Sequence, residues 1–118
     1  MTASGEPTIF HACPGTLWKQ AQAVGVYALS AVGGAFIHLS PLCALAQTLA
    51  LHFAGRRDLV LLSVSPALLG PALRWEKSRG NLLFPHLYGD LPLAAVLGVD
   101  ALPLDGKGVH ILPARFTK

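Results

Sequence analysis

The sequence contains few charged residues. Asp, Glu, Lys and Arg make up only 13% of its 118 residues, about half of the share that is usual in a soluble domain. Nine basic and six acidic residues give a formal net charge of +3, and the basic residues are scattered along the chain. Because nucleic-acid binding needs cations gathered on one face, we expect no nucleic-acid partner. So apolar a chain must bury much of its surface, and a homodimer is one way to do so.

Cysteine is also scarce. Cys13 and Cys43 lie far apart and form no C-x-x-C pair, which argues against a disulfide framework and predicts two free thiols. No short-spaced pair of ligands on a helix suggests a metal site, so none is predicted. Residues 1–7 lack the basic and apolar regions of a secretion signal, and we therefore expect a cytoplasmic protein.

No charged residue occurs between Lys19 and Arg56, and an uncharged stretch of this length raises the question of a membrane span. Gly33-Gly34 and Ser40-Pro41 interrupt it, however, and each pair is a start or stop signal for a short element. We therefore predict several short elements of a folded domain here, and no membrane partner.

The spacing of apolar residues predicts two helices in the first half of the chain and mainly strands afterwards. Helices are expected at 16–25, with Thr16 as its N-cap, and at 41–53, with the Ser40 hydroxyl as its cap. Strands or short extended pieces are expected at 8–11, 26–28, 35–39, 58–65, 72–76, 93–99 and 110–112. Early helices followed by strands favour an α+β fold. The single domain would cover residues 1–118, with a core at about 8–100 and tails at 1–7 and 113–118.

The first candidate site residues are two histidines. His38 follows an apolar run and precedes a predicted helix N-terminus, where free amide groups favour an anion or a polar ligand. His11 ends the first predicted strand. Two interpretations stay open: both imidazoles face one cleft, or both are buried and fix strand ends through backbone hydrogen bonds.

Five further residues are candidates for the same site. Trp75 and Glu76 are neighbours on a predicted strand, so one should be buried and the other open or in the cleft. Glu76 is a candidate general base or ribose anchor, whereas Trp75 is either a core residue or a ligand contact. Tyr88 would stack on a flat ring or be buried with a bonded hydroxyl, and His86 would bind ligand or fix its loop. Ser40 is primarily a cap, with ligand contact as the alternative.

Several of these stretches together resemble a known family. The motifs F-I-H-L-S at 36–40 and F-P-H-L-Y-G at 84–89 are similar, in order and spacing, to those of the bacterial family called domain of unknown function 952. The stretches I-F-H at 9–11, D-L-V-L-L-S-V at 58–64 and R-W-E at 74–76 extend the resemblance over about residues 8–100. That family is grouped by fold with the ADP-ribosyltransferase-like superfamily. The resemblance implies two small mixed or antiparallel sheets around a cleft, which holds NAD in active relatives.

The resemblance also implies roles for individual residues. His11 corresponds by position to a histidine that hydrogen-bonds the nicotinamide ribose, and His38 corresponds to the second motif. Transferases of the toxin type use a strand-borne glutamate, for which Glu76 is the candidate. The implied function is binding of NAD or a related nucleotide. If the protein is an enzyme, the resemblance implies either cleavage of the nicotinamide–ribose bond with transfer of ADP-ribose or a phosphotransferase-like activity. The competing hypothesis is a non-catalytic module that binds a small ligand or another protein on the same fold.

Overall fold

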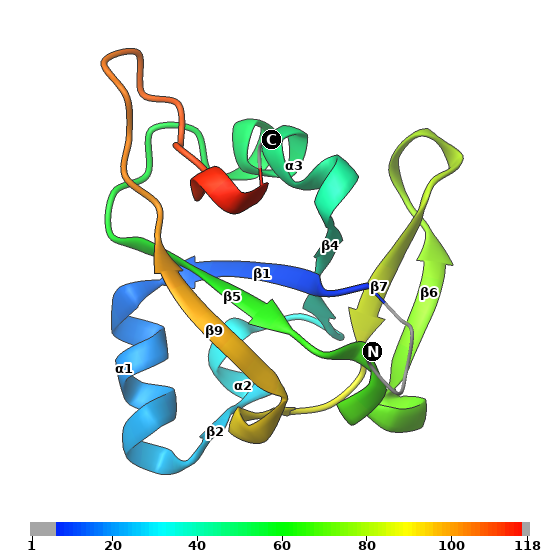
Figure 1. The fold of residues 1–118 in the computed structure, drawn as a ribbon. Helices are drawn as coiled ribbons and strands as arrows, with labels where there is room; N and C mark the ends of the chain where they lie inside the picture. Colours follow the sequence, from blue (N-terminus) through cyan, green and yellow to red (C-terminus); the bar gives the residue numbers. More distant parts are fainter. Residues whose placement is uncertain (1–6, 117–118) are drawn as a thin grey trace.

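The computed structural model describes residues 7–116, which form three small antiparallel sheets and three α-helices (Figure 1). The four-stranded sheet has the order β4-β1-β5-β9, with bounds Ser40–Pro41, Ile9–Pro14, Leu59–Val64 and Val96–Ala101. The three-stranded sheet has the order β3-β7-β6, with bounds Ile37–His38, Leu83–Leu87 and Leu73–Lys77. A two-stranded sheet pairs β2 (Val26–Tyr27) with β8 (Leu91–Pro92). The α+β class is confirmed, although the sequence predicted two sheets and not three.

Two of the helices were predicted. α1 (Gly15–Val24) ends at Gly25, which adopts a left-handed conformation (φ 102°) that glycine tolerates best. α3 (Leu42–His52) lies close to its predicted bounds. The described residues also contain five 3₁₀ turns, at 66–68, 70–72, 79–81, 93–95 and 114–116. The turn at 93–95 occupies the first half of the strand predicted at 93–99.

The third helix, α2 (Leu29–Val32), is a single turn that the sequence analysis did not identify. Its first amide, the N–H of Leu29, donates to the carboxylate of Asp90 at 2.8 Å. The group that satisfies the start of this helix therefore comes from a residue 61 positions further along the chain. A partner so far away leaves no local signal in the sequence.

The predicted cap of α3 is wrong. Ser40 lies in β4, directly opposite Phe10 of β1, and its hydroxyl donates to the carbonyl of Pro41 at 2.9 Å. Pro41 is extended (φ −70°, ψ 160°) and precedes the helix instead of starting it. Pairing with β1 holds Ser40 in the strand, one residue too early to cap α3 with its side chain.

The predicted cap of α1 is also wrong. The helix starts at Gly15, so Thr16 lies inside the first turn, and the residue at the N-cap is Pro14. The amide of Gly15 donates to the carbonyl of Asp58 at 2.6 Å, which provides a partner from the loop before β5.

Strand β1 separates two groups of buried apolar side chains. One face contacts α1, α2 and the two smaller sheets through residues that include Ile9 and Cys13. The other face contacts α3 through Phe10 and Ala12, which pack with Leu45 and Leu49. β5 pairs with β1 along its whole length and is buried on both faces, as its nearly continuous apolar run predicts.

The end of the described chain packs against this second group. Phe116 contacts the ring of Phe10 edge-on, with ring centroids 5.0 Å apart. Arg115 makes two hydrogen bonds to the carboxylate of Asp100 in β9, at 3.2 and 2.6 Å. Residues 114–116 are therefore part of the folded domain, although a tail was predicted at 113–118. Of the tail predicted at 1–7, residues 1–6 lie outside the described part of the chain. None of the helices between residues 7 and 116 has the length and apolar character that a membrane crossing requires.

Candidate functional site

A cavity of about 480 Å³ lies between β1, α3 and the three-stranded sheet. This volume is within the range of small-molecule sites. Its walls are mainly apolar, and four of the five histidines of the chain line it: His11, His38, His52 and His86. Among the described residues, no Asp, Glu, Lys or Arg lines the cavity. The polar side chains of its wall are chiefly these histidines, together with Tyr27, Ser40, Thr48 and Ser78.

His11 lies in the middle of β1, not at its end, and uses both ring nitrogens within the protein. Its Nδ1–H donates to the carbonyl of His38 at 2.7 Å. Because a carbonyl can only accept, Nε2 has no proton and accepts from the hydroxyl of Tyr27 at 2.9 Å. The side chain thereby connects β1 to β3, two strands of different sheets.

The surroundings of His11 keep it neutral. Burial lowers the pKa of His11 to about 4, and the hydrogen bond to the His38 carbonyl only partly opposes this. Burial also raises the pKa of the neighbouring Cys13 thiol to about 11, and it raises the pKa of Tyr27. All three groups are therefore uncharged at neutral pH, and Cys13 is no thiolate nucleophile.

His38 closes β3 and pairs with His86 of β7, with ring centroids 5.5 Å apart. The pKa of His38 is lowered by partial burial first, and then by the nearby His86 and His52. Among the described contacts, no hydrogen bond occupies its ring nitrogens, although its backbone carbonyl holds His11. The imidazole of His38 is therefore available to a ligand.

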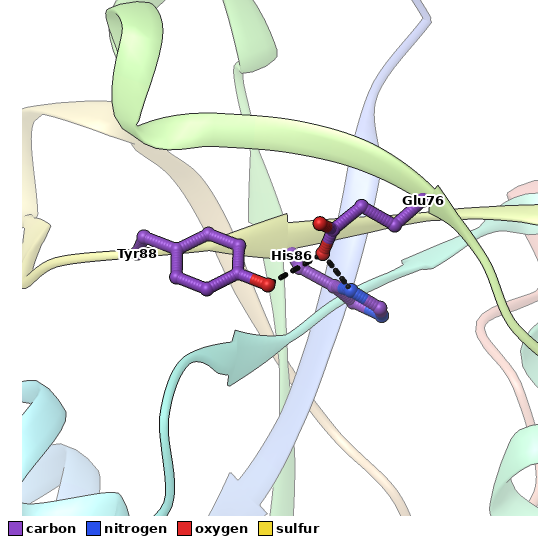
Figure 2. Close-up of polar contacts among 3 residues, drawn as sticks. All are labelled: Glu76, His86 and Tyr88. Carbon is purple, nitrogen blue, oxygen red and sulfur yellow. Dashed lines mark hydrogen bonds and ion pairs between the residues drawn. The ribbon is translucent and has the colours of Figure 1, made fainter.

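His86 belongs to a network with Glu76 and Tyr88 (Figure 2). Its Nδ1 lies 2.8 Å from Glu76 Oε1, and the Tyr88 hydroxyl donates to the same oxygen at 2.6 Å. These two hydrogen bonds, that of Tyr88 first, lower the pKa of Glu76, which is therefore a carboxylate at neutral pH. Phe36 stacks on the other side of the His86 ring, with centroids 4.1 Å apart and an angle of 22°.

Strand register explains why these groups meet. His86 pairs with His38 on one side and with Arg74 on the other, so the three side chains form a row across β3-β7-β6. Glu76 lies two residues beyond Arg74 and therefore shares its face. The guanidinium of Arg74 lies over the Tyr88 ring, 5.1 Å from its centroid. Histidines, carboxylate and cation thus share one face of the sheet.

Trp75 is placed differently from the other candidates. It projects from the opposite face of β6, across from Pro85, and is 43% exposed. It neither lines the cavity nor packs in the core. The expectation that either Trp75 or Glu76 is buried is wrong, because β6 is an edge strand and Glu76 is partly exposed too.

The remaining candidates divide into two sets. His11, His38, Ser40 and His86 line the cavity, whereas Glu76 and Tyr88 reach it through their contacts with His86. His52 also lies in the wall, although it was not among the candidates of the sequence analysis. Leu45, Thr48 and His52 lie at positions i, i+3 and i+7 of α3, a spacing that puts all three on one helix face and could have indicated it. Within residues 7–116, no group of three or more His, Cys, Asp or Glu side chains is arranged to hold a metal ion.

Fold and site together define an α+β domain whose histidine-lined cavity lies between small antiparallel sheets. The chain belongs to the family described as "Protein of unknown function (DUF952)", whose model matches residues 12–99. The family part of the predicted resemblance is thereby confirmed.

Solved structures of one bacterial relative share this fold. The crystal structure of protein CC0527 from Caulobacter crescentus has a TM-score of 0.86 at 35% identity, covering 94% of this chain and 99% of that one. The solution NMR structure of the same protein has a TM-score of 0.75 at 38% identity, covering 86% and 90% of the two chains. No curated protein matches the chain. The function has to be argued from the site itself.

Proposed function

We propose that the cavity binds a nucleoside or nucleotide through its nucleoside end, with NAD as the candidate ligand. The observation that carries the proposal is that His38 and His86 line a mainly apolar cavity and that, among the described residues, no hydrogen bond occupies the ring nitrogens of His38 or Nε2 of His86. A few polar groups within apolar walls are typical of small-molecule sites. The resemblance to ADP-ribosyltransferase-like proteins supports NAD in particular.

The charge of the site supports one orientation of such a ligand. A diphosphate inside the cavity would find no Lys or Arg among the described lining residues, and burying an unpaired anion costs several kcal/mol. The nicotinamide riboside end carries no phosphate, and its single positive charge is delocalised over an aromatic ring, so it fits the apolar walls better than the diphosphate does. The diphosphate would then lie at the open side, where Arg74 continues the row of His38 and His86 across the sheet.

Two activities are compatible with such binding. An ADP-ribosyltransferase-like enzyme would cleave the nicotinamide–ribose bond and would need a negative group to stabilise the positive charge that develops on the ribose. Glu76 is the candidate carboxylate, but it lies outside the cavity wall and already accepts two hydrogen bonds. This observation favours the second candidate, a non-catalytic module that binds the ligand and leaves it intact.

Calorimetry with NAD, ADP-ribose and nicotinamide at pH 7.5 and fixed ionic strength tests the proposal. We expect NAD to bind and His38→Ala to weaken binding about tenfold, the effect of losing one hydrogen bond. Trp75→Ala is the matched control, because this aromatic side chain lies on the opposite face of β6, and its affinity should equal that of the wild type. Chromatography of the mixture then separates the two activities, since only an enzyme releases nicotinamide. No binding of NAD or ADP-ribose at millimolar concentration by the folded protein would refute the proposal.

A further inference from the structure

The network around His86 fixes the position of one proton. The Glu76 carboxylate has only acceptors, and the Tyr88 hydroxyl has already given its single proton to Oε1. A hydrogen bond between His86 Nδ1 and the same oxygen therefore requires the proton to be on Nδ1. In the neutral imidazole, Nε2 must then carry the lone pair.

This lone pair is accessible from the cavity. His86 lines the cavity, and no hydrogen bond found among the described residues uses its Nε2. In the same part of the chain, Ser63 Oγ is the one fully buried side-chain polar atom without a partner. Nε2 of His86 is therefore unpaired but not sealed in the core, and the cavity is the space it faces.

The ring is also held in place. Phe36 stacks on its face, and the ring of His38 meets it edge-on, at an angle of 72°. Glu76 fixes Nδ1, because the register of β6 with β7 places its carboxylate on the same face of the sheet as His86. With its orientation and tautomer both set, Nε2 is a preorganised acceptor.

We propose that His86 is the hydrogen-bond acceptor of the cavity and binds a hydroxyl group of the ligand, such as a ribose hydroxyl, with Glu76 as its positioning residue. This inference rests on the proposed function and adds the group that recognises the sugar. It gives His86 the role that the resemblance assigned to His11, whose Nε2 is occupied by Tyr27. It also replaces a direct contact of Glu76 with the ligand by an indirect one.

A pair of variants separates the two roles of Glu76. In Glu76→Gln the amide oxygen can still accept from His86 Nδ1–H and from Tyr88, but the charge is gone. In Glu76→Leu neither bond can form. Long-range ¹H–¹⁵N NMR spectra report which ring nitrogen of His86 carries the proton in each protein, and calorimetry with ADP-ribose reports affinity. Trp75→Leu, one residue away on the opposite face, controls for a change in the stability of β6.

We expect Nδ1–H in the wild type and in Glu76→Gln, with affinities within about threefold of each other. Glu76→Leu should lose the fixed tautomer and about tenfold in affinity, the effect of losing one hydrogen bond to the ligand. Bound ADP-ribose should shift the Nε2 resonance of His86 in the wild type.

Three results would overturn the inference. The first is a wild-type His86 with its proton on Nε2. The second is a Glu76→Gln affinity as low as that of Glu76→Leu with the Nδ1–H tautomer intact, since the carboxylate charge itself would then be needed. The third is bound ADP-ribose that leaves Nε2 unshifted, which would refute the inference and retain the proposed function. No binding of ADP-ribose by any variant would refute both.

Discussion

His11 and His86 are almost equally buried, at 7% and 6% exposure, and both line the same cavity. Their hydrogen bonds differ. His11 has a backbone carbonyl on one nitrogen and a tyrosine hydroxyl on the other, in surroundings without charge. His86 has a carboxylate on one nitrogen, and none of the described hydrogen bonds occupies the other. Burial alone therefore does not separate a histidine that holds the fold from one that can bind a ligand, whereas a complete account of its partners does.

The largest effect is expected for His11→Ala. The substitution leaves a cavity in β1 and removes the partners of the Tyr27 hydroxyl and the His38 carbonyl, so the free energy of unfolding should fall by about 4 kcal/mol. Urea unfolding measures this change. His86→Ala is the comparison and should cost about 2 kcal/mol, because removing this ring also leaves a cavity but its hydrogen-bond partner Glu76, which is partly exposed, can turn to water. Equal losses for the two variants would contradict the distinction between the two histidines.

The second prediction concerns pH. The pKa of His11 is about 4 in the folded protein and ~6.5 when unfolded, so between these values the unfolded chain binds more protons. Stability should therefore fall as the pH decreases from about 6.5 to 4, by on the order of 3 kcal/mol, and this contribution should level off below pH 4. Urea unfolding across this range is compared for the wild type and His11→Gln. Because both proteins have the same carboxylates, the difference between their pH dependences gives the contribution of His11. The same pH dependence in both proteins would show that His11 is not its source.

A smaller effect is expected for Tyr27→Phe, which makes the hydrogen bonding of His11 more like that of His86. Removal of the hydroxyl leaves Nε2 of His11 without its donor, and the unfolding free energy should fall by about 1–2 kcal/mol. The freed nitrogen becomes a second acceptor at the cavity. We therefore expect ADP-ribose affinity to be retained or increased, measured by calorimetry beside the wild type. A strong loss of affinity in a folded Tyr27→Phe protein would mean that this hydroxyl itself contacts the ligand.

The parts of the fold that follow local rules could be predicted from the sequence. α1 and α3 show apolar residues at helical spacing, and the continuous apolar run at 58–65 indicates a strand that is buried on both faces. The parts that depend on distant partners could not be predicted. α2 needs the carboxylate of Asp90, and Ser40 is held in β4 by its pairing with Phe10 of β1.

The candidate site, like the fold, could be predicted from the sequence only in part. His11, His38 and His86 stood out because histidines follow or interrupt apolar stretches, and all three line one cavity. Which nitrogen of each ring is occupied depends on tertiary contacts, so the different environments of His11 and His86 could not be deduced. Of Trp75 and Glu76, one side chain was expected to be buried and the other to be open or in the cleft. The rule of alternation placed them on opposite faces correctly, but it does not reveal that β6 lies at an edge.

The contact between Phe116 and Phe10 has a practical consequence for handling this protein. Phe10 lines the cavity, and Phe116 contacts its ring edge-on. The last described turn of the chain therefore packs on a residue of the cavity wall. A purification tag or a truncation near Ala114 would therefore act close to the cavity wall. Affinities measured with and without a carboxy-terminal tag need not agree, and an untagged protein is the better choice for the calorimetry described above.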